Sequence, residues 1–252
     1  MRILLTGSHG TLGPKVARVF TRDGATCVGW DRDRVSPDDE RASLTFLDEV
    51  RPDAIVHLAM GSERWAALLA AWANERGIPF VFTSTAMVFH HEPDGPHHRD
   101  DERTARDDYG RYKIRCEDAV TASHPGATIA RIGWQIDEDA TGNNMLAHLD
   151  AWQRERGKVE ASRAWRPACS FMTDTASALW TLVTTPRAGA VHLDSNARGG
   201  HTFDEVARAL ARRFDRAWTI EVNEAYAHDQ RLVGNERLMP DLADRLTALR
   251  GA

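Results

Sequence analysis

Lysine, tyrosine and cysteine are scarce in this chain of 252 residues, which has three of each. The cysteines, Cys27, Cys116 and Cys169, lie far apart and form no CxxC pair, so the sequence offers no disulfide framework and is typical of a reducing compartment. No segment approaches the run of about 18 apolar residues that a membrane-spanning helix needs. The formal net charge of −5 argues against nucleic acid or an anionic membrane as a partner. We therefore expect a soluble cytoplasmic protein.

Short apolar runs alternate with amphipathic stretches over the first 134 residues. The runs are continuously apolar, which is typical of strands buried on both faces of a parallel sheet. We predict strands at 2–6, 25–30, 54–59, 80–85 and 127–132, and helices at 12–22, 42–50, 64–76 and 104–123. This alternation predicts an α/β fold with a doubly wound parallel sheet.

The alternation of apolar runs and amphipathic stretches becomes less regular after Trp134. We predict helices at 143–156 and 202–214, and a further helix–strand unit at 173–183 and 190–194 that returns to the sheet. Thr202 and Glu205 have the spacing of a capping box at a helix start. We therefore expect a core of residues 1–134 plus about 173–194, and a small discontinuous lobe of about 135–172 plus 195–252.

Gly7, Gly10 and Gly13 follow the first predicted strand and open the first predicted helix. Glycines in this context permit a tight turn and a close backbone approach, and the N–H groups at the helix start can bind a pyrophosphate. The alternative is a plain glycine-rich turn between a strand and a helix. The position of the motif favours a dinucleotide-binding turn.

Asp31 ends the second predicted strand, 18 residues after Gly13. A carboxylate there can accept hydrogen bonds from the adenosine ribose hydroxyls and repels a 2′-phosphate, which favours NAD. Arg32 and Arg34 favour NADP instead, because a guanidinium can bind that phosphate. NADP therefore stays open, as does the alternative that Asp31 is only a solvated strand-end residue.

Tyr109 and Lys113 lie four residues apart on the predicted helix 104–123, and hence on one face of it. A lysine ammonium, together with an oxidised nicotinamide, favours the phenolate and would lower the pKa of the tyrosine, so that it can exchange a proton with a substrate oxygen. Ser84 and Thr85 end the fourth predicted strand, at the edge where ligands of such sheets bind. We favour Thr85 as the hydroxyl that binds the substrate oxygen.

The segments TGSHGTLG, DAIVHLA, STAMVF and YGRYK together resemble the motifs of the extended short-chain dehydrogenase/reductases, the superfamily of NAD-dependent epimerases and dehydratases. STAMVF, ARIGW and GNNML are most similar to the dTDP-4-dehydrorhamnose reductase branch. The resemblance implies a Rossmann fold and an NAD(P)-dependent oxidoreductase that acts on a nucleotide-linked sugar. It also implies that Thr85, Tyr109 and Lys113 are the catalytic residues.

The same resemblance implies a set of cofactor-binding residues. The cofactor would contact Gly7, His9, Gly10, Thr11, Leu12, Gly13, Asp31, Arg32, Leu58, Ala59, Met60, Thr83, Tyr109 and Lys113. From their positions at strand ends and at a helix start, we also expect substrate contacts from Ser84, Arg131, Trp134 and Asn144. For Trp134 the alternative is ordinary core packing, and for Asn144 it is a helix N-cap, which asparagine does well.

The stretch 60–76 is shorter than its counterpart in the resembled family, where it contributes to the dimer helices and to closure over the cofactor. The sequence therefore leaves open whether the chain forms a homodimer. Two rival functions also stay open: an epimerase or dehydratase that oxidises and re-reduces its sugar in one cycle, and a cofactor-binding regulatory protein without turnover.

The segment FHHEPDGPHHRDDE carries four of the eleven histidines and joins the strand that ends at Thr85 to the helix that carries Tyr109. Side chains of adjacent residues in an extended loop diverge, and the histidines lack the four-residue helical spacing of a metal pair. We therefore predict no metal site there, and a polar loop that faces the substrate. The alternative is a plain solvated loop.

Overall fold

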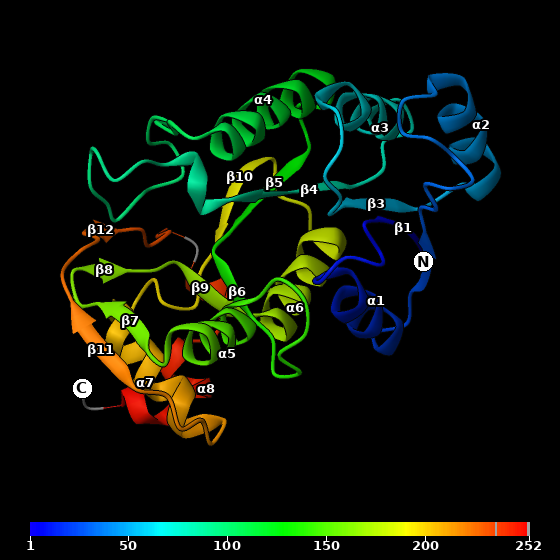
Figure 1. Ribbon diagram of the computed structural model, residues 1–252. Helices are drawn as coiled ribbons and strands as arrows, with labels where there is room; N and C mark the ends of the chain where they lie inside the picture. The colour runs from blue at the N-terminus through cyan, green and yellow to red at the C-terminus, as the bar shows by residue number, and fades with distance from the viewer. Residues whose placement is uncertain (235, 251–252) are drawn as a thin grey trace. The chain divides into compact units, whose positions relative to one another are not determined.

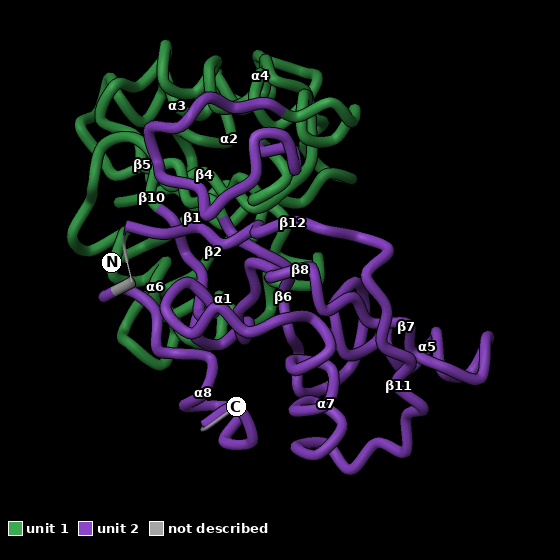
Figure 2. The backbone as a smooth tube through the Cα atoms, turned by 90° about the vertical axis from the view of Figure 1, so that its left-hand side faces the viewer, with its two compact units in different colours: residues 1–88, 105–131, 176–191 green, residues 89–104, 132–175, 192–252 purple. Residues whose placement is uncertain are grey.

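The computed structural model describes residues 1–234 and 236–250. Contacts between residues divide the chain into two compact units, shown in Figure 2. Unit 1 comprises 1–88, 105–131 and 176–191, and unit 2 comprises 89–104, 132–175 and 192–252. The expected core and lobe differ from these units chiefly in the segment 89–104, whose contacts group it with unit 2.

The central sheet has six strands: β1 (Arg2–Thr6), β2 (Thr26–Gly29), β3 (Ala54–His57), β4 (Phe80–Thr85), β5 (Thr128–Ile132) and β10 (Gly189–Leu193). Their order across the sheet is β10-β5-β4-β3-β1-β2. β1 pairs in parallel with both β2 and β3, so the chain reverses its direction of travel across the sheet at β1. Ligands of such sheets bind at the carboxyl ends of the strands beside this reversal, which here are the ends of β1 and β3.

Helices cover both faces of this sheet (Figure 1). They are α1 (Gly13–Arg22) and α6 (Met172–Thr184) on one face, and α2 (Glu40–Val50), α3 (Glu63–Glu75) and α4 (Asp108–Ser123) on the other. A short 3-10 turn, η1 (Ala86–Val88), follows β4. The rings of Phe20 and Trp180 pack edge to face at 5.3 Å between α1 and α6, and buried Trp65, Leu69 and Phe82 belong to the core on the opposite face.

The strands form where continuous apolar runs predict them, and the fold is the expected α/β sheet. Helix α4 begins at Asp108 rather than at 104, because the side chain of Asp107 accepts a hydrogen bond from the N–H of Gly110 at 2.8 Å and caps the helix there. Helix α2 begins two residues earlier than predicted for the same reason, with Asp39 accepting from the N–H of Ala42.

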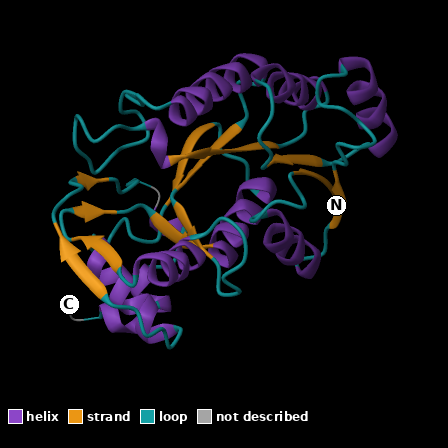
Figure 3. Cartoon of the chain, in the orientation of Figure 1, coloured by secondary structure: helices purple, strands orange, loops and turns teal. Residues whose placement is uncertain are grey.

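Unit 2 is built from small sheets and helices, shown with the rest of the chain in Figure 3. Its strands are β6 (Trp134–Ile136), β7 (Val159–Ser162), β8 (Trp165–Arg166), β9 (Cys169–Phe171), β11 (Ile220–Asn223) and β12 (His228–Asp229). Its helices are α5 (Met145–Arg156), α7 (Phe203–Arg213) and α8 (Leu242–Arg245), with 3-10 turns η2 (Glu236–Leu238) and η3 (Thr247–Leu249). The carboxylate of Glu205 accepts from the N–H of Thr202 at 2.9 Å, as the predicted capping box requires. Among the described residues, no helix is long and apolar enough to cross a membrane.

Candidate active site

The glycine turn after β1 has the geometry that the motif predicts. Gly7 has φ of +70°, which a side chain would disfavour, and its carbonyl oxygen accepts the N–H of Gly10 at 2.9 Å. A Cβ on Gly13 would overlap the carbonyl oxygen of Gly7 and would lie 2.7 Å from the carbonyl of Ser8. The start of α1 also has no side-chain cap. These features fit a phosphate-bearing cofactor that approaches the backbone closely.

The end of β3 lies directly against this turn. A Cβ on Gly7 would meet the backbone nitrogen of Ala59 at 3.0 Å. The hydroxyl of Thr6 accepts the N–H of Ala59 at 3.2 Å and bonds Nδ1 of His57 at 2.8 Å. The structure thus brings together the segment of Leu58, Ala59 and Met60 and the glycine turn, both of which the sequence assigns to the cofactor.

His57 is a residue of this region to which the sequence analysis gave no role. Its ring is buried, lies edge to face with Trp65 at 4.7 Å and stacks on Phe82 at 5.6 Å. Burial, and then the positive charges of Lys113 and Arg32, lower its pKa from 6.5 to about 3. The folded protein therefore holds His57 neutral across the range in which an unfolded chain would protonate it.

This predicts a pH-dependent stability. Because the folded pKa lies below the unfolded one, the contribution of His57 is complete above about pH 6.5 and is lost as the pH falls toward about 3, by about 1.4 kcal/mol per pH unit. Urea unfolding in neutral and in mildly acidic buffer measures this loss. We expect a smaller loss in His57→Asn, whose amide does not titrate. An equal loss in both proteins would contradict this assignment.

Asp31 and Arg32 have different environments at the end of β2. Asp31 is exposed, and its carboxylate accepts the N–H of Asp33 at 3.0 Å. The guanidinium of Arg32 donates to the carbonyl oxygen of Met60 and lies 5.3 Å from the ring centroid of Trp65. Arg32 is thus held against the end of β3, whereas the carboxylate of Asp31 faces solvent.

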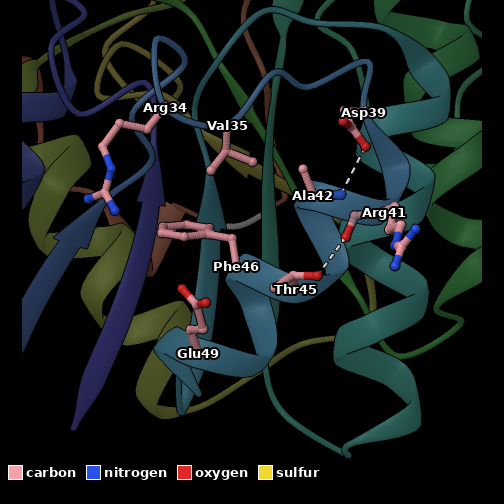
Figure 4. Close-up of a pocket in the computed structure, with 8 residues that line it drawn as sticks. All are labelled: Arg34, Val35, Asp39, Arg41, Ala42, Thr45, Phe46 and Glu49. Atoms are coloured by element: carbon pink, nitrogen blue, oxygen red, sulfur yellow. Dashed lines mark hydrogen bonds between the residues drawn. The ribbon is translucent and has the colours of Figure 1, made fainter.

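A cavity of about 370 Å³ follows this strand end along the chain (Figure 4). It is lined by Arg34, Val35, Asp39, Arg41, Ala42, Thr45, Phe46 and Glu49. Two of these side chains are basic and two are acidic, so the lining does not single out an anion. The cavity therefore does not supply the dedicated phosphate site that Arg34 could otherwise provide.

Thr85 and Tyr109 meet through their side chains. The side chain of Thr85 is close enough to the phenol of Tyr109 to influence its pKa, and the hydroxyl oxygen of Thr85 accepts the N–H of Met87 at 3.2 Å. Partial burial of the phenol raises the pKa of Tyr109 above its usual value of 10, although the residue is 39% exposed, and the side chain of Thr85 opposes this only in part. Tyr109 is therefore a protonated phenol at neutral pH. The prediction that Lys113 and an oxidised nicotinamide together lower this pKa concerns the cofactor-bound protein, and it stays a prediction.

Lys113 lies one helical turn from Tyr109, with its side chain buried. Its ammonium donates to the carbonyl oxygen of Thr83 at 2.9 Å and lies 4.7 Å above the ring of Phe82. Burial lowers its pKa to about 8. The arrangement holds a positive charge on the face of α4 that carries Tyr109, at the end of β4.

Tyr112, within the segment YGRYK, also belongs to this region, although no role was predicted for it. Its hydroxyl donates to the carbonyl oxygen of Gly61 at 2.7 Å and accepts the N–H of the same residue at 3.2 Å. It thereby ties α4 to the segment that follows β3. The signal in the sequence was its rarity, since the chain has only three tyrosines.

Two of the predicted substrate residues have structural partners. Arg131 is buried and forms a two-pronged ion pair with buried Glu117, at 3.0 and 2.8 Å. Asn144 is the N-cap of α5: its side chain accepts the N–H of Ala147 at 3.0 Å and donates to the carbonyl oxygen of Thr141 at 2.8 Å. These contacts account for both residues without a ligand.

The other predicted residues are placed as follows. Trp134 packs at 6.0 Å against both Trp165 and Phe203 in the core of unit 2. The hydroxyl of Ser84 is buried without a hydrogen-bond partner among the described residues. It could therefore donate or accept a hydrogen bond at the end of β4. His9, Thr11 and Leu12 lie in or beside the glycine turn, between β1 and α1.

The chain matches the family model described as the RmlD substrate binding domain, over residues 1–67 and 62–229. It is 28% identical over 210 residues to a dTDP-4-dehydrorhamnose reductase from Burkholderia thailandensis, a match that covers 75% of this chain and 70% of that one. It is 29% identical over 160 residues to a probable low-salt glycan biosynthesis reductase from Haloferax volcanii, a match that covers 53% of each chain.

Among solved structures, the chain is similar to a dTDP-4-dehydrorhamnose reductase from Bacillus anthracis in complex with NADP. The TM-score is 0.83, and the superposition covers 99% of this chain and 98% of that one. The sequence identity is 18%, so this likeness is one of fold.

Proposed function

The chain belongs to the RmlD substrate binding domain family, and on this premise we propose that it is an NAD(P)-dependent reductase of a nucleotide-linked keto sugar. The substrate class is that of dTDP-4-dehydrorhamnose, on which the relatives of this chain are named as acting. The proposal differs from an epimerase or dehydratase in that the sugar leaves the protein reduced.

The observation that supports the proposal is the approach of the Thr85 side chain to the phenol of Tyr109, close enough to influence its pKa. Two hydroxyls that meet in this way can bind one carbonyl oxygen between them. A phenol is protonated at neutral pH, and the raised pKa of Tyr109 keeps it so. A proton donor at this position suits reduction, in which the carbonyl oxygen must gain a proton.

We assign the steps as follows. Bound nicotinamide supplies the hydride that the keto carbon receives. The hydroxyl of Thr85 donates a hydrogen bond to the carbonyl oxygen, and Tyr109 transfers its phenolic proton to that oxygen, so that the ketone becomes a secondary alcohol. The ammonium of Lys113, fixed by the carbonyl of Thr83, stabilises the phenolate that remains.

The cofactor preference follows from the end of β2. Arg32 already donates to the carbonyl oxygen of Met60, so it is not poised to bind a 2′-phosphate. The exposed carboxylate of Asp31 can accept ribose hydroxyls and repels that phosphate. We therefore assign NAD as the preferred cofactor and NADP as the weaker one.

The substrate is tested by following NADH oxidation by the purified chain with dTDP-4-dehydrorhamnose. We expect oxidation to require this keto sugar. dTDP-glucose, which has the same nucleotide and no keto group, is expected to give none. Equal rates with both sugar nucleotides, or no oxidation with either, would contradict the assignment.

The cofactor preference is tested by the ratio of kcat/KM for NADH to that for NADPH. We expect the ratio to exceed about 10 in the wild type, which corresponds to about 1.4 kcal/mol of discrimination. Asp31→Ala removes the repulsion and should reduce the ratio toward one. Arg34→Ala is the matched control, since it removes a neighbouring charge of the opposite sign. A preference for NADPH that disappears in Arg34→Ala would show instead that Arg34 binds the phosphate.

A further inference from the structure

The four histidines of the segment 89–104 fall into two structurally different pairs. His97 is buried and stacks on Phe89, with ring centroids 4.4 Å apart. Its Nε2 shares a hydrogen bond with Nε2 of buried His228 at 3.0 Å. His97 is thus a packing residue of unit 2, whereas its neighbour His98 is exposed.

His90 and His91 behave differently from what the sequence predicts. Adjacent side chains were expected to diverge, but the two imidazole rings lie with their centroids 3.8 Å apart. The cause is the local turn: the N–H of His90 donates to the hydroxyl of Thr104 at 3.0 Å, and the N–H of Glu92 donates to Nδ1 of His90 at 3.2 Å. The backbone therefore curls, and both rings lie on one side of it.

Glu92 completes a cluster with these two rings. One possible ligand atom from each of His90, His91 and Glu92 lies within 4.8 Å of the others. Ligand atoms around a tetrahedral zinc ion are roughly 3.3 Å apart, given metal–nitrogen bonds of about 2.0 Å. Exposed side chains such as His91 and Glu92 can close this difference by small rotations.

The segment that carries the cluster is acidic in sequence, which also favours a cation. Five acidic residues lie in the same segment: Glu92, Asp94, Asp100, Asp101 and Glu102. Only two arginines, Arg99 and Arg103, oppose them within it. Two imidazoles and one carboxylate are the donor set that zinc and its neighbours in the first transition row accept, whereas magnesium and calcium take oxygen ligands.

We propose that His90, His91 and Glu92 form a binding site for a divalent transition metal of the zinc class. The three side chains supply three ligands, and water fills the remaining position. Metal binding by His90 replaces the hydrogen bond that its Nδ1 accepts from the N–H of Glu92. The site belongs to the segment between β4 and α4 and uses none of the residues assigned to the cofactor. The proposed metal site does not depend on the proposed reductase function, and each is tested separately.

The test is calorimetric titration of the tag-free, chelator-treated full chain with zinc chloride. We expect one zinc ion per chain, and binding at least about tenfold weaker in His91→Ala and in Glu92→Gln, since loss of a ligand is felt more strongly than loss of an outer partner. Magnesium chloride should give no saturable heat. His98→Ala, which removes an exposed histidine of the same segment, is the matched control and should bind zinc like the wild type.

Two results would overturn the proposal. One is the absence of saturable zinc binding by the wild type. The other is unchanged affinity in the double variant His91→Ala/Glu92→Gln, which would place the zinc elsewhere, for example on a cysteine. Circular dichroism of each variant, recorded without metal, establishes that it is folded, and the visible spectrum of bound cobalt reports whether nitrogen ligands are lost.

Discussion

Replacing Tyr109 by phenylalanine is expected to lower kcat by about 10² to 10⁴, the usual contribution of a positioned acid or base. The variant keeps the ring and loses only the hydroxyl that lies near Thr85 and is proposed to donate the proton. Because Tyr109 is 39% exposed, its loss should leave the melting temperature almost unchanged. Steady-state kinetics with the keto sugar, together with calorimetric binding of NADH, separates the lost chemistry from lost binding.

Tyr112→Phe is the matched control for this substitution. It removes the same group three residues along the same helix, where the hydroxyl bonds the backbone of Gly61 rather than Thr85. We expect this variant to lose about 1 kcal/mol of unfolding free energy and to retain most of kcat. If the two variants lost kcat equally, the proton donor would not be identified by the contact with Thr85.

Gly13→Ala is expected to weaken NADH binding by about 10- to 100-fold. The added methyl group would overlap the carbonyl oxygen of Gly7, so the turn must open, and backbone strain of about 1–3 kcal/mol corresponds to this loss of affinity. Calorimetry measures the affinity, and thermal unfolding reports the strain as a lowered melting temperature.

Gly126→Ala provides the comparison. A Cβ there would meet the His124 ring at 3.1 Å, a side chain that can move, and the position is far along the chain from the glycine turn. We expect unchanged NADH affinity. Wild-type affinity in Gly13→Ala would mean that the cofactor does not use this turn.

The sheet could be predicted closely because its signal is local. A strand buried on both faces, such as Phe80–Thr85, favours a continuous run of apolar and small residues, and its bounds in the structure are those expected. The glycine turn was also predictable, since the close approach of Gly13 to Gly7 excludes any side chain. Helix starts were less so, because they depend on capping by side chains such as Asp107.

Contacts set by the order of the strands were not predictable from the sequence. His57 bonds Thr6 because β3 lies beside β1, and nothing in the run AIVHLA distinguishes a buried histidine from an exposed one. Arg32 follows β2 and Met60 follows β3, and the two residues meet because both strands flank β1. The divergence expected of His90 and His91 was wrong because a turn, rather than an extended backbone, holds them.

Deuterium transfer shows whether the chain reduces the keto sugar with the hydride of the nicotinamide. The purified chain is incubated with dTDP-4-dehydrorhamnose and NADH deuterated at the transferring position of the nicotinamide, and the sugar nucleotide is then analysed by mass spectrometry and NMR. We expect a reduced sugar with one deuterium at the former keto carbon. A sugar that stays unreduced, or one that changes configuration without gaining deuterium, would contradict this expectation, and the second result would identify an epimerase instead.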